Sequence, residues 1–240
     1  MEITLSGGFG VMEKKYTFED LLEIVKKLRG EGGCPWDREQ THESIKQNII
    51  EEGYELVEAI DGGDFAKVAD ESGDLLLQVV FHAQIGTENG EYGMEDVTDA
   101  ICRKLIHRHP HVFGSETAEN SDEVLEKWNQ IKRDDRGQKT VAEEMAGVPK
   151  MLPSLMRAEK IQGKAEKNGY IFNEPAVAAD NISGMINVLA GCADSEAAEK
   201  YIGKMLFELV SVAKTMNVDA EVALNRHLEE FIQEFSKYER

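Results

Sequence analysis

Four carboxylates lie in mirror order around one short turn, and they constrain the fold of this chain more than any other feature. The turn is the sequence Asp-Gly-Gly-Asp at 61–64. If helices flank the turn and fold back on each other, Glu55 faces Glu71, since both are equally far from residue 63. Glu52 faces Asp74 by the same symmetry, and residues three apart share a helix face. Such carboxylates repel one another without a cation, so the pattern predicts a helical hairpin that binds divalent metal.

The same helical periodicity continues along most of the chain, and no segment shows sustained β alternation. We therefore expect an all-α fold, an antiparallel helical bundle. The polar stretch 132–139 is typical of a boundary, which predicts domains at 1–138 and 139–240. The first expected helix begins at Thr17 and ends before the Gly-rich break at 30–35. The other expected helices cover about 42–60, 64–90, 94–108, a segment that begins at Ser121, 151–167, 174–190, 195–216 and 219–237.

The second half of the chain partly repeats the first. The segment Gly73–Val80 resembles Gly203–Val210 at a constant offset of 130, and the apolar positions match. The carboxylates do not match, because Lys204 stands at the position of Asp74 and Tyr201 at the position of Glu71. From these residues alone, both a duplicated fold that has lost its metal site and a chance similarity between helices remain open.

Composition narrows the range of partners. The net charge is −19, which disfavours nucleic acid or an acidic membrane surface as a partner. No apolar run approaches the roughly 18 residues that span a bilayer, and residues 1–12 lack the pattern of a secretory signal. The three cysteines are dispersed along the chain, at 34, 102 and 192, which favours a reducing cytoplasm over a disulfide framework.

An ordinary solvated helix face is the alternative explanation for the four carboxylates, because the chain has 46 acidic residues. Two features favour metal binding: the symmetry about the turn, and the strongly apolar sequence around each pair, where no Lys or Arg has a matching spacing. Hard oxygen ligands without histidine suit Mg²⁺, or Mn²⁺ in its place, rather than zinc. Because Mg²⁺ is commonly shared with substrate phosphates, a phosphate ester or anhydride is the expected substrate.

Four runs together resemble the MazG family of nucleoside triphosphate pyrophosphohydrolases: Gly33–Thr41, Glu51–Glu55, Glu71–His82 and Lys104–Gly114. The resemblance is dense from about 17 to 138 and weaker beyond, and since longer members contain two such domains in tandem, it favours duplication. It implies hydrolysis of a nucleoside triphosphate between the α and β phosphates. It also implies Mg²⁺ held by Glu52, Glu55, Glu71 and Asp74. Glu51 is either an outer ligand, the group that orients the attacking water, or an ordinary exposed glutamate.

The resemblance also implies which residues contact the nucleotide. Lys104 and Arg108 match the family's phosphate-contacting positions, although cations at a helix end are also favoured by the helix dipole. Trp128 and Lys132 resemble a Trp and Lys that close over the nucleotide, and Trp36 either stacks on a base or locks its loop. The family treats the segment with His107, His109 and His111 as structural rather than as a zinc site.

In the second repeat, Glu230 and Glu234 align with the phosphate-binding cations of the first, so we expect that repeat to bind neither Mg²⁺ nor triphosphate and to serve as scaffold or dimer interface. The overall expectation is an Mg²⁺-dependent cytoplasmic enzyme, acting on nucleoside triphosphates as a homodimer. Two alternatives stay open: a nucleotide or alarmone sensor without turnover, and a structural helical partner protein.

Overall fold

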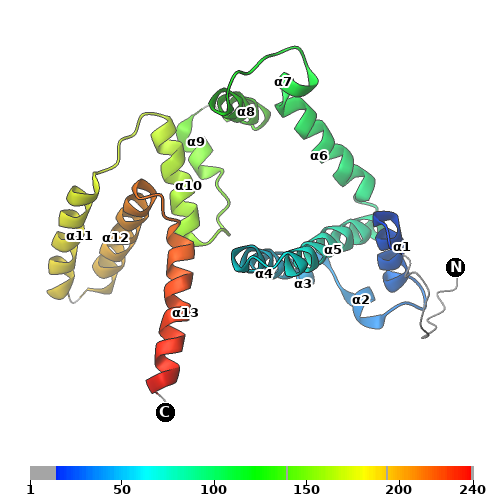
Figure 1. The fold of residues 1–240 in the computed structure, drawn as a ribbon, viewed down its shortest axis with the longest axis horizontal. Helices are drawn as coiled ribbons and strands as arrows, with labels where there is room; N and C mark the ends of the chain where they lie inside the picture. The colour runs from blue at the N-terminus through cyan, green and yellow to red at the C-terminus, as the bar shows by residue number, and fades with distance from the viewer. Residues whose placement is uncertain (1–14, 139, 193, 239–240) are drawn as a thin grey trace. The chain divides into compact units, whose positions relative to one another are not determined.

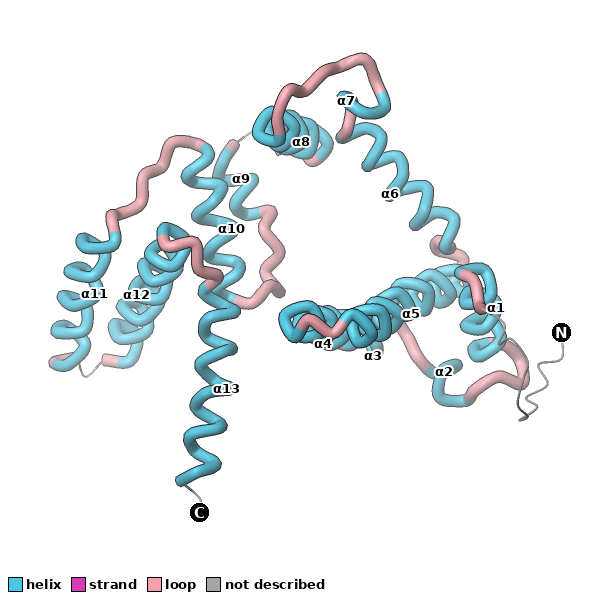
Figure 2. Tube along the Cα trace, in the orientation of Figure 1, coloured by secondary structure: helices cyan, strands magenta, loops and turns pink. Residues whose placement is uncertain are grey.

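The computed structural model describes residues 15–138, 140–192 and 194–238, so the expectation for residues 1–12 lies outside the described chain. The described residues form an all-α protein without strands, as predicted (Figures 1 and 2). The helices are α1 (Phe18–Arg29), α2 (Pro35–Glu39), α3 (His42–Ile45), α4 (Asn48–Gly62), α5 (Phe65–Asn89), α6 (Met94–Arg108), α7 (Pro110–Phe113), α8 (Ser121–Asp135), α9 (Val141–Ala146), α10 (Ser154–Lys167), α11 (Pro175–Ala190), α12 (Ser195–Thr215) and α13 (Ala220–Tyr238).

The chain divides into two compact units, 1–117 and 118–240. This division places α8 in the second unit, whereas the sequence placed the domain boundary after residue 138. The first four residues of the predicted linker are helical, because α8 continues to Asp135. No helix in the described parts of the chain is both long and apolar enough to cross a lipid bilayer.

The predicted hairpin of the first unit is present, and local chemistry explains its turn. Gly63 ends α4 with a φ of 70°, in the left-handed region that favours glycine. The side chain of Asp64 then accepts hydrogen bonds from the backbone N–H groups of Ala66 and Lys67, which caps α5. The two long helices pack against each other along the hairpin (Figure 1).

The helix predicted over 42–60 is divided into α3 and α4, which corrects the sequence interpretation. Thr41 and Ser44 form a capping box that begins α3. Lys46 and Gln47 keep right-handed helical backbone angles, but α4 starts only at Asn48. The irregularity follows Ile45, which is buried in the core of the first unit with Val25, Val80, Phe81 and Ile85.

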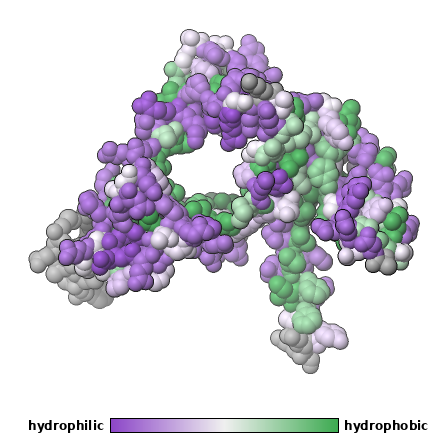
Figure 3. Space-filling model, turned by 180° about the vertical axis from the view of Figure 1, so that it is seen from behind, coloured by the Kyte–Doolittle hydropathy of each residue, from purple (hydrophilic) through white to green (hydrophobic). Residues whose placement is uncertain are grey.

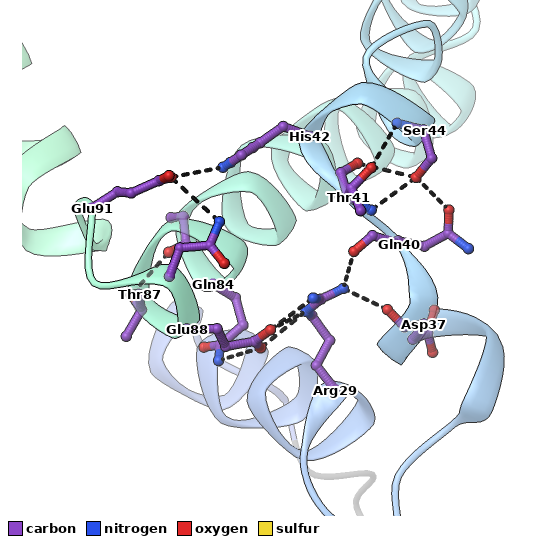
Figure 4. Close-up of polar contacts among 12 residues, drawn as sticks. Arg29, Asp37, Gln40, Thr41, His42, Ser44, Gln84, Thr87, Glu88 and Glu91 are labelled. Carbon is purple, nitrogen blue, oxygen red and sulfur yellow. Dashed lines mark hydrogen bonds and ion pairs between the residues drawn. The ribbon is translucent and has the colours of Figure 1, made fainter.

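Arg29 connects three elements of the first unit (Figure 4). Its side chain is 4% exposed and donates to both carboxylate oxygens of Glu88 on α5, with the shortest contact at 2.7 Å. It also donates to the backbone carbonyls of Asp37 and Gln40, at the end of α2. The guanidinium lies 5.4 Å from the ring centre of Phe81. One buried cation thus holds the loop around α2 against α1 and α5.

The second unit is built on a second pair of neighbouring helices, α11 and α12, with α10 packed on α12. Its buried apolar side chains are Val148, Ala165, Ala178 and Val210. A polar link crosses this core, where the fully buried Gln162 donates through Nε2 to the carbonyl of Phe207 at 2.8 Å. The short helices α2, α7 and α9 were not predicted, since four to six residues offer too few positions for a period to show.

Candidate metal centre

Three of the four mirror-ordered carboxylates meet on the α4–α5 hairpin. Glu52, Glu55 and Glu71 each offer an oxygen within 4.8 Å of the others. Glu71 is buried, with 7% of its surface exposed, whereas Glu52 is half-buried and Glu55 is exposed. No other trio of His, Cys, Asp or Glu within the described residues brings its ligand atoms this close. The cluster thus combines a buried carboxylate, Glu71, with an exposed one, Glu55, and solvent can reach it from the side of Glu55.

The electrostatics of the cluster oppose full ionisation. Burial, followed by the charges of Asp74, Glu55 and Glu51, raises the pKa of Glu52 above its usual value. Burial and then the nearby Glu55 raise the pKa of Glu71 as well. A carboxylate whose charged form is disfavoured by neighbouring anions is stabilised when a cation joins the group. A cation among these carboxylates would relieve their mutual repulsion.

Asp74 and Glu51 lie at the edge of this group. Both side chains are exposed. Asp74 is the largest charge influence on Glu52 and also raises the pKa of Glu71 slightly, so its carboxylate faces both. It does not join the tight group formed by the other three predicted ligands. A role for Asp74 as a fourth ligand stays a prediction.

Sequence reasoning missed two residues at the cluster. Gln78 is buried at 7% exposure and donates from Nε2 to Oε1 of Glu52 at 3.4 Å. It lies four residues after Asp74, so helical spacing could have identified it. Lys67 lies four residues before Glu71 and lowers the pKa of that carboxyl, which corrects the expectation that no cation has a suitable spacing. Lys67 also lies 3.8 Å from Glu58, so its charge is shared.

The predicted phosphate-binding cations lie on α6. Lys104 is exposed and Arg108 is half-buried. The first residue of this helix, Met94, packs on the core of the first unit beside α5. Lys104 and Arg108 are in the later turns, and the described contacts do not bring them to the carboxylates. Their role toward phosphate stays a prediction.

Trp36 lies on α2 with 62% of its surface exposed. Its carbonyl accepts a hydrogen bond from Nε2 of Gln40 at 2.8 Å, whereas its indole is not packed into a core. The loop is instead held by Arg29, which contacts the carbonyls of Asp37 and Gln40. The side chain of Trp36 is thus available for stacking, one of the two interpretations that the sequence left open.

Trp128 and Lys132 are neighbours on α8, where the ammonium lies 4.8 Å from the indole centre. Both are half-buried in the second unit. The two side chains, which the family resemblance had assigned a joint role, thus form a cation–π contact. Their closure over a nucleotide stays a prediction.

The described structure contains two pairs of neighbouring histidines, and the two pairs make different contacts. The rings of His109 and His111 are 5.7 Å apart and tilted, and Nδ1 of His109 lies 2.6 Å from the carbonyl of Leu105. His42 on α3 and His82 on α5 stack at 4.9 Å with their Nδ1 atoms 2.6 Å apart. Burial and then His42 lower the pKa of His82. This second pair, which sequence reasoning missed, joins α3 to α5 because two distant histidines meet in the fold.

The carboxylate oxygens of the cluster favour a hard divalent cation. Three carboxylates of mixed burial provide hard ligands for Mg²⁺ or Mn²⁺ and leave open positions for water or phosphate oxygens. Structural zinc prefers sulfur and imidazole ligands, which the cluster lacks. Chemically, the hairpin can hold a divalent cation with one face available to an anionic substrate.

The sequence of this chain is similar to those of known nucleotide pyrophosphohydrolases. Residues 40–113 match the MazG nucleotide pyrophosphohydrolase domain. The chain is 39% identical over 222 residues to the nucleoside triphosphate pyrophosphohydrolase/pyrophosphatase MazG of Thermotoga maritima, covering 92% of this chain and 85% of that protein. It is 40% identical over 226 residues to the nucleoside triphosphate pyrophosphohydrolase of Escherichia coli K12, covering 92% and 86%. The crystal structure of a MazG-related protein from Thermotoga maritima aligns with a TM-score of 0.42 and 27% identity over 48% of this chain and 98% of that one.

Proposed function

Because the chain belongs to the MazG family of nucleotide pyrophosphohydrolases, we propose that it hydrolyses nucleoside triphosphates between the α and β phosphates. The products are a nucleoside monophosphate and pyrophosphate. The observation that carries the proposal is the cluster of Glu52, Glu55 and Glu71 on the α4–α5 hairpin, with ligand oxygens within 4.8 Å. The substrate class is taken from the names of the relatives. The carboxylate cluster offers a site for the divalent cation that would bind the triphosphate.

We infer that Glu52, Glu55 and Glu71 hold Mg²⁺, or Mn²⁺ in its place, with Asp74 as the fourth ligand. A bound divalent ion lowers the pKa of a water and offsets the charge of the phosphates. Gln78 orients Glu52 through its hydrogen bond. Glu51 is placed on α4 beside Glu52, where it can accept a proton from a water molecule or position it.

The remaining site residues are assigned to the nucleotide. Lys104 and Arg108 contact the phosphates, since an i,i+4 pair of cations can follow a chain of anionic oxygens. Trp36 stacks on the base, which its exposed indole permits. Trp128 and Lys132 close over the nucleotide.

The proposal is tested by incubating the full chain with a panel of ribo- and deoxyribonucleoside triphosphates and Mg²⁺. Pyrophosphate and phosphate are both measured. We expect pyrophosphate as the first phosphorus product, and its loss in Glu71→Gln and Asp74→Ala variants that remain folded by circular dichroism. Glu31→Gln, which changes an exposed carboxylate outside the cluster, is the matched control and should retain turnover. Nucleotide binding without any turnover would support a sensor instead.

We further propose that the chain acts as a homodimer. Leu224, Leu228, Phe231 and Phe235 form one face of α13, and each is between 46% and 56% exposed. Figure 3 shows hydrophobic side chains along this helix. An apolar face of this extent on a helix is typical of an interface, and a second copy of the chain is the proposed partner. Phe231→Glu should shift the mass in analytical ultracentrifugation from dimer to monomer, and an unchanged mass would remove α13 from the interface.

We also assign the protein to the cytoplasm. Cys34, Cys102 and Cys192 are free thiols without disulfide partners in the described chain. This state matches a reducing compartment. Nucleoside triphosphates are abundant there, so the location agrees with the proposed substrate. Localising a tagged full-length chain by cell fractionation tests this assignment.

A further inference from the structure

The second unit contains an open pocket of about 770 Å³, formed by α11, α12 and the loop that precedes α11. This volume lies in the range of ligand-binding pockets. Every residue that lines it belongs to the second unit, so the pocket is separate from the carboxylate cluster. Neither the proposed hydrolysis nor the proposed dimer uses it.

Aromatic rings form one wall of the pocket. Tyr170 and Phe172 meet edge to face, with ring centres 4.7 Å apart. Phe207 on α12 extends the wall, with its ring centre 6.0 Å from that of Phe172. The rings are inclined to one another and partly exposed, so an incoming planar ring can stack on one and meet the edge of another.

Two lysines also line the pocket. Lys200 and Lys204 lie four residues apart on α12, hence on one face of the helix. Both are exposed, and the ammonium of Lys204 lies 6.0 Å from the ring centre of Tyr201. Gly203 lies between them and also lines the pocket, and a Cβ placed there meets no heavy atom within 4 Å. The helix therefore presents two positive charges beside free space.

Polar side chains line the pocket as well. Nδ2 of Asn173 donates to the carboxylate of Glu208 at 3.2 and 3.4 Å. Glu208 can accept further hydrogen bonds from hydroxyl or amino groups, whereas it repels an anion. Asn181 adds a second amide to the lining. A suitable ligand therefore combines an aromatic ring, neutral hydrogen-bond donors and an anionic group.

We propose that this pocket binds a nucleoside monophosphate without a metal ion. The base stacks on the aromatic wall, the sugar hydroxyls donate to Glu208, and the phosphate lies between Lys200 and Lys204. Two lysines balance the double negative charge of a monophosphate. A triphosphate would bring additional negative charge next to Glu208 without a cation to offset it, so the monophosphate fits better.

The comparison between the two hairpins explains how such a site can exist without metal. Lys204 stands where the first hairpin has Asp74, and Tyr201 stands where it has Glu71. These replacements remove carboxylates that could hold a cation and put a cationic side chain in their place. The change that prevents Mg²⁺ binding thus provides the positive charge that a phosphate needs.

The test is isothermal titration of the full chain with adenosine, guanosine and uridine monophosphates, with EDTA present throughout. We expect one binding event per chain. Lys204→Glu should weaken binding by about tenfold or more, since a charge-assisted contact is replaced by repulsion. Lys160→Glu makes the same charge change on an exposed lysine of α10 outside the pocket and should leave binding unchanged.

A second variant removes space rather than charge. Gly203→Phe places a ring in the pocket, where the backbone has room for a side chain, and replaces a residue that weakens helices. It should abolish monophosphate binding while the protein remains folded. The proposal is overturned if all three monophosphates fail to bind, or if neither variant weakens their binding. It is also overturned if inorganic phosphate binds as tightly as the nucleotides. Because no turnover is measured, these outcomes are independent of the proposed hydrolysis.

Discussion

Replacing Arg29 by methionine should destabilise the first unit strongly. The side chain is 4% exposed and is the shared partner of Glu88 and of two backbone carbonyls at the end of α2. Methionine fills a similar volume without donating any hydrogen bond. The Arg29→Met variant therefore leaves the carboxylate and both carbonyls without this donor, while the apolar packing next to Phe81 is retained.

The size of the effect follows from the burial of the pair. Removing one partner of a buried ion pair costs roughly 3–5 kcal/mol. The side chain of Glu88 is 36% exposed, so water hydrates part of the released charge. We therefore expect about 3 kcal/mol, at the lower end of that range. For a domain near 100 residues, each kcal/mol shifts the Tm by about 4–8 °C, so the expected fall is about 12–24 °C.

Differential scanning calorimetry of the full chain measures this shift, with Arg29→Lys as a variant that keeps the charge but loses the forked geometry. Arg29 lowers the pKa of Glu88 through its hydrogen bonds. Stability from the pair is therefore present above the ordinary carboxyl pKa and is lost as pH falls through the lower folded pKa. The difference between wild type and Arg29→Met should shrink in acid. A fall in Tm below about 3 °C at neutral pH would refute the reasoning.

Three further predictions concern the first unit. Mg²⁺ at about 100 times its Kd should stabilise the wild type by about 2.7 kcal/mol, and Glu71→Gln should lose this gain in a fluorescence melting titration. Because the pKa of His82 is lowered in the folded state, the free energy of unfolding should be highest above the ordinary histidine pKa and should fall as the pH drops through the folded pKa. Urea unfolding at a series of pH values should show a free energy of unfolding that depends less on pH in the His82→Leu variant. Lys104→Ala should raise the KM for the triphosphate about tenfold, and an unchanged KM would remove Lys104 from the phosphate site.

The hairpin could be predicted from the sequence because its determinants are local. Gly63 favours a left-handed conformation and Asp64 caps the next helix, and both effects act within a few residues. Long helices with apolar stripes are also visible in the sequence, which is why α5, α6 and α10 were placed to within a few residues. The meeting of Glu52, Glu55 and Glu71 follows from that hairpin.

Contacts between distant residues could not be predicted in this way. Arg29 and Glu88 are 59 positions apart, and His42 and His82 are 40 apart. Nothing in local spacing pairs them, because their proximity depends on how α1, α3 and α5 pack. The division of the predicted helix at 42–60 depends on the same packing, since Ile45 is held in the core immediately before the irregularity. Gln78 could have been predicted from the sequence, because it lies four residues after Asp74 and therefore on the same face of the helix.

The most direct test of the central claim follows the phosphorus products of triphosphate hydrolysis by ³¹P NMR, with Mg²⁺ and then with EDTA. The account predicts nucleoside monophosphate and pyrophosphate in equal amounts, formed only with the divalent ion and not by Glu71→Gln. Nucleoside diphosphate and phosphate as first products would show that another bond is cleaved. Undiminished pyrophosphate release by a folded Glu71→Gln variant would show that the chemistry lies away from the α4–α5 hairpin.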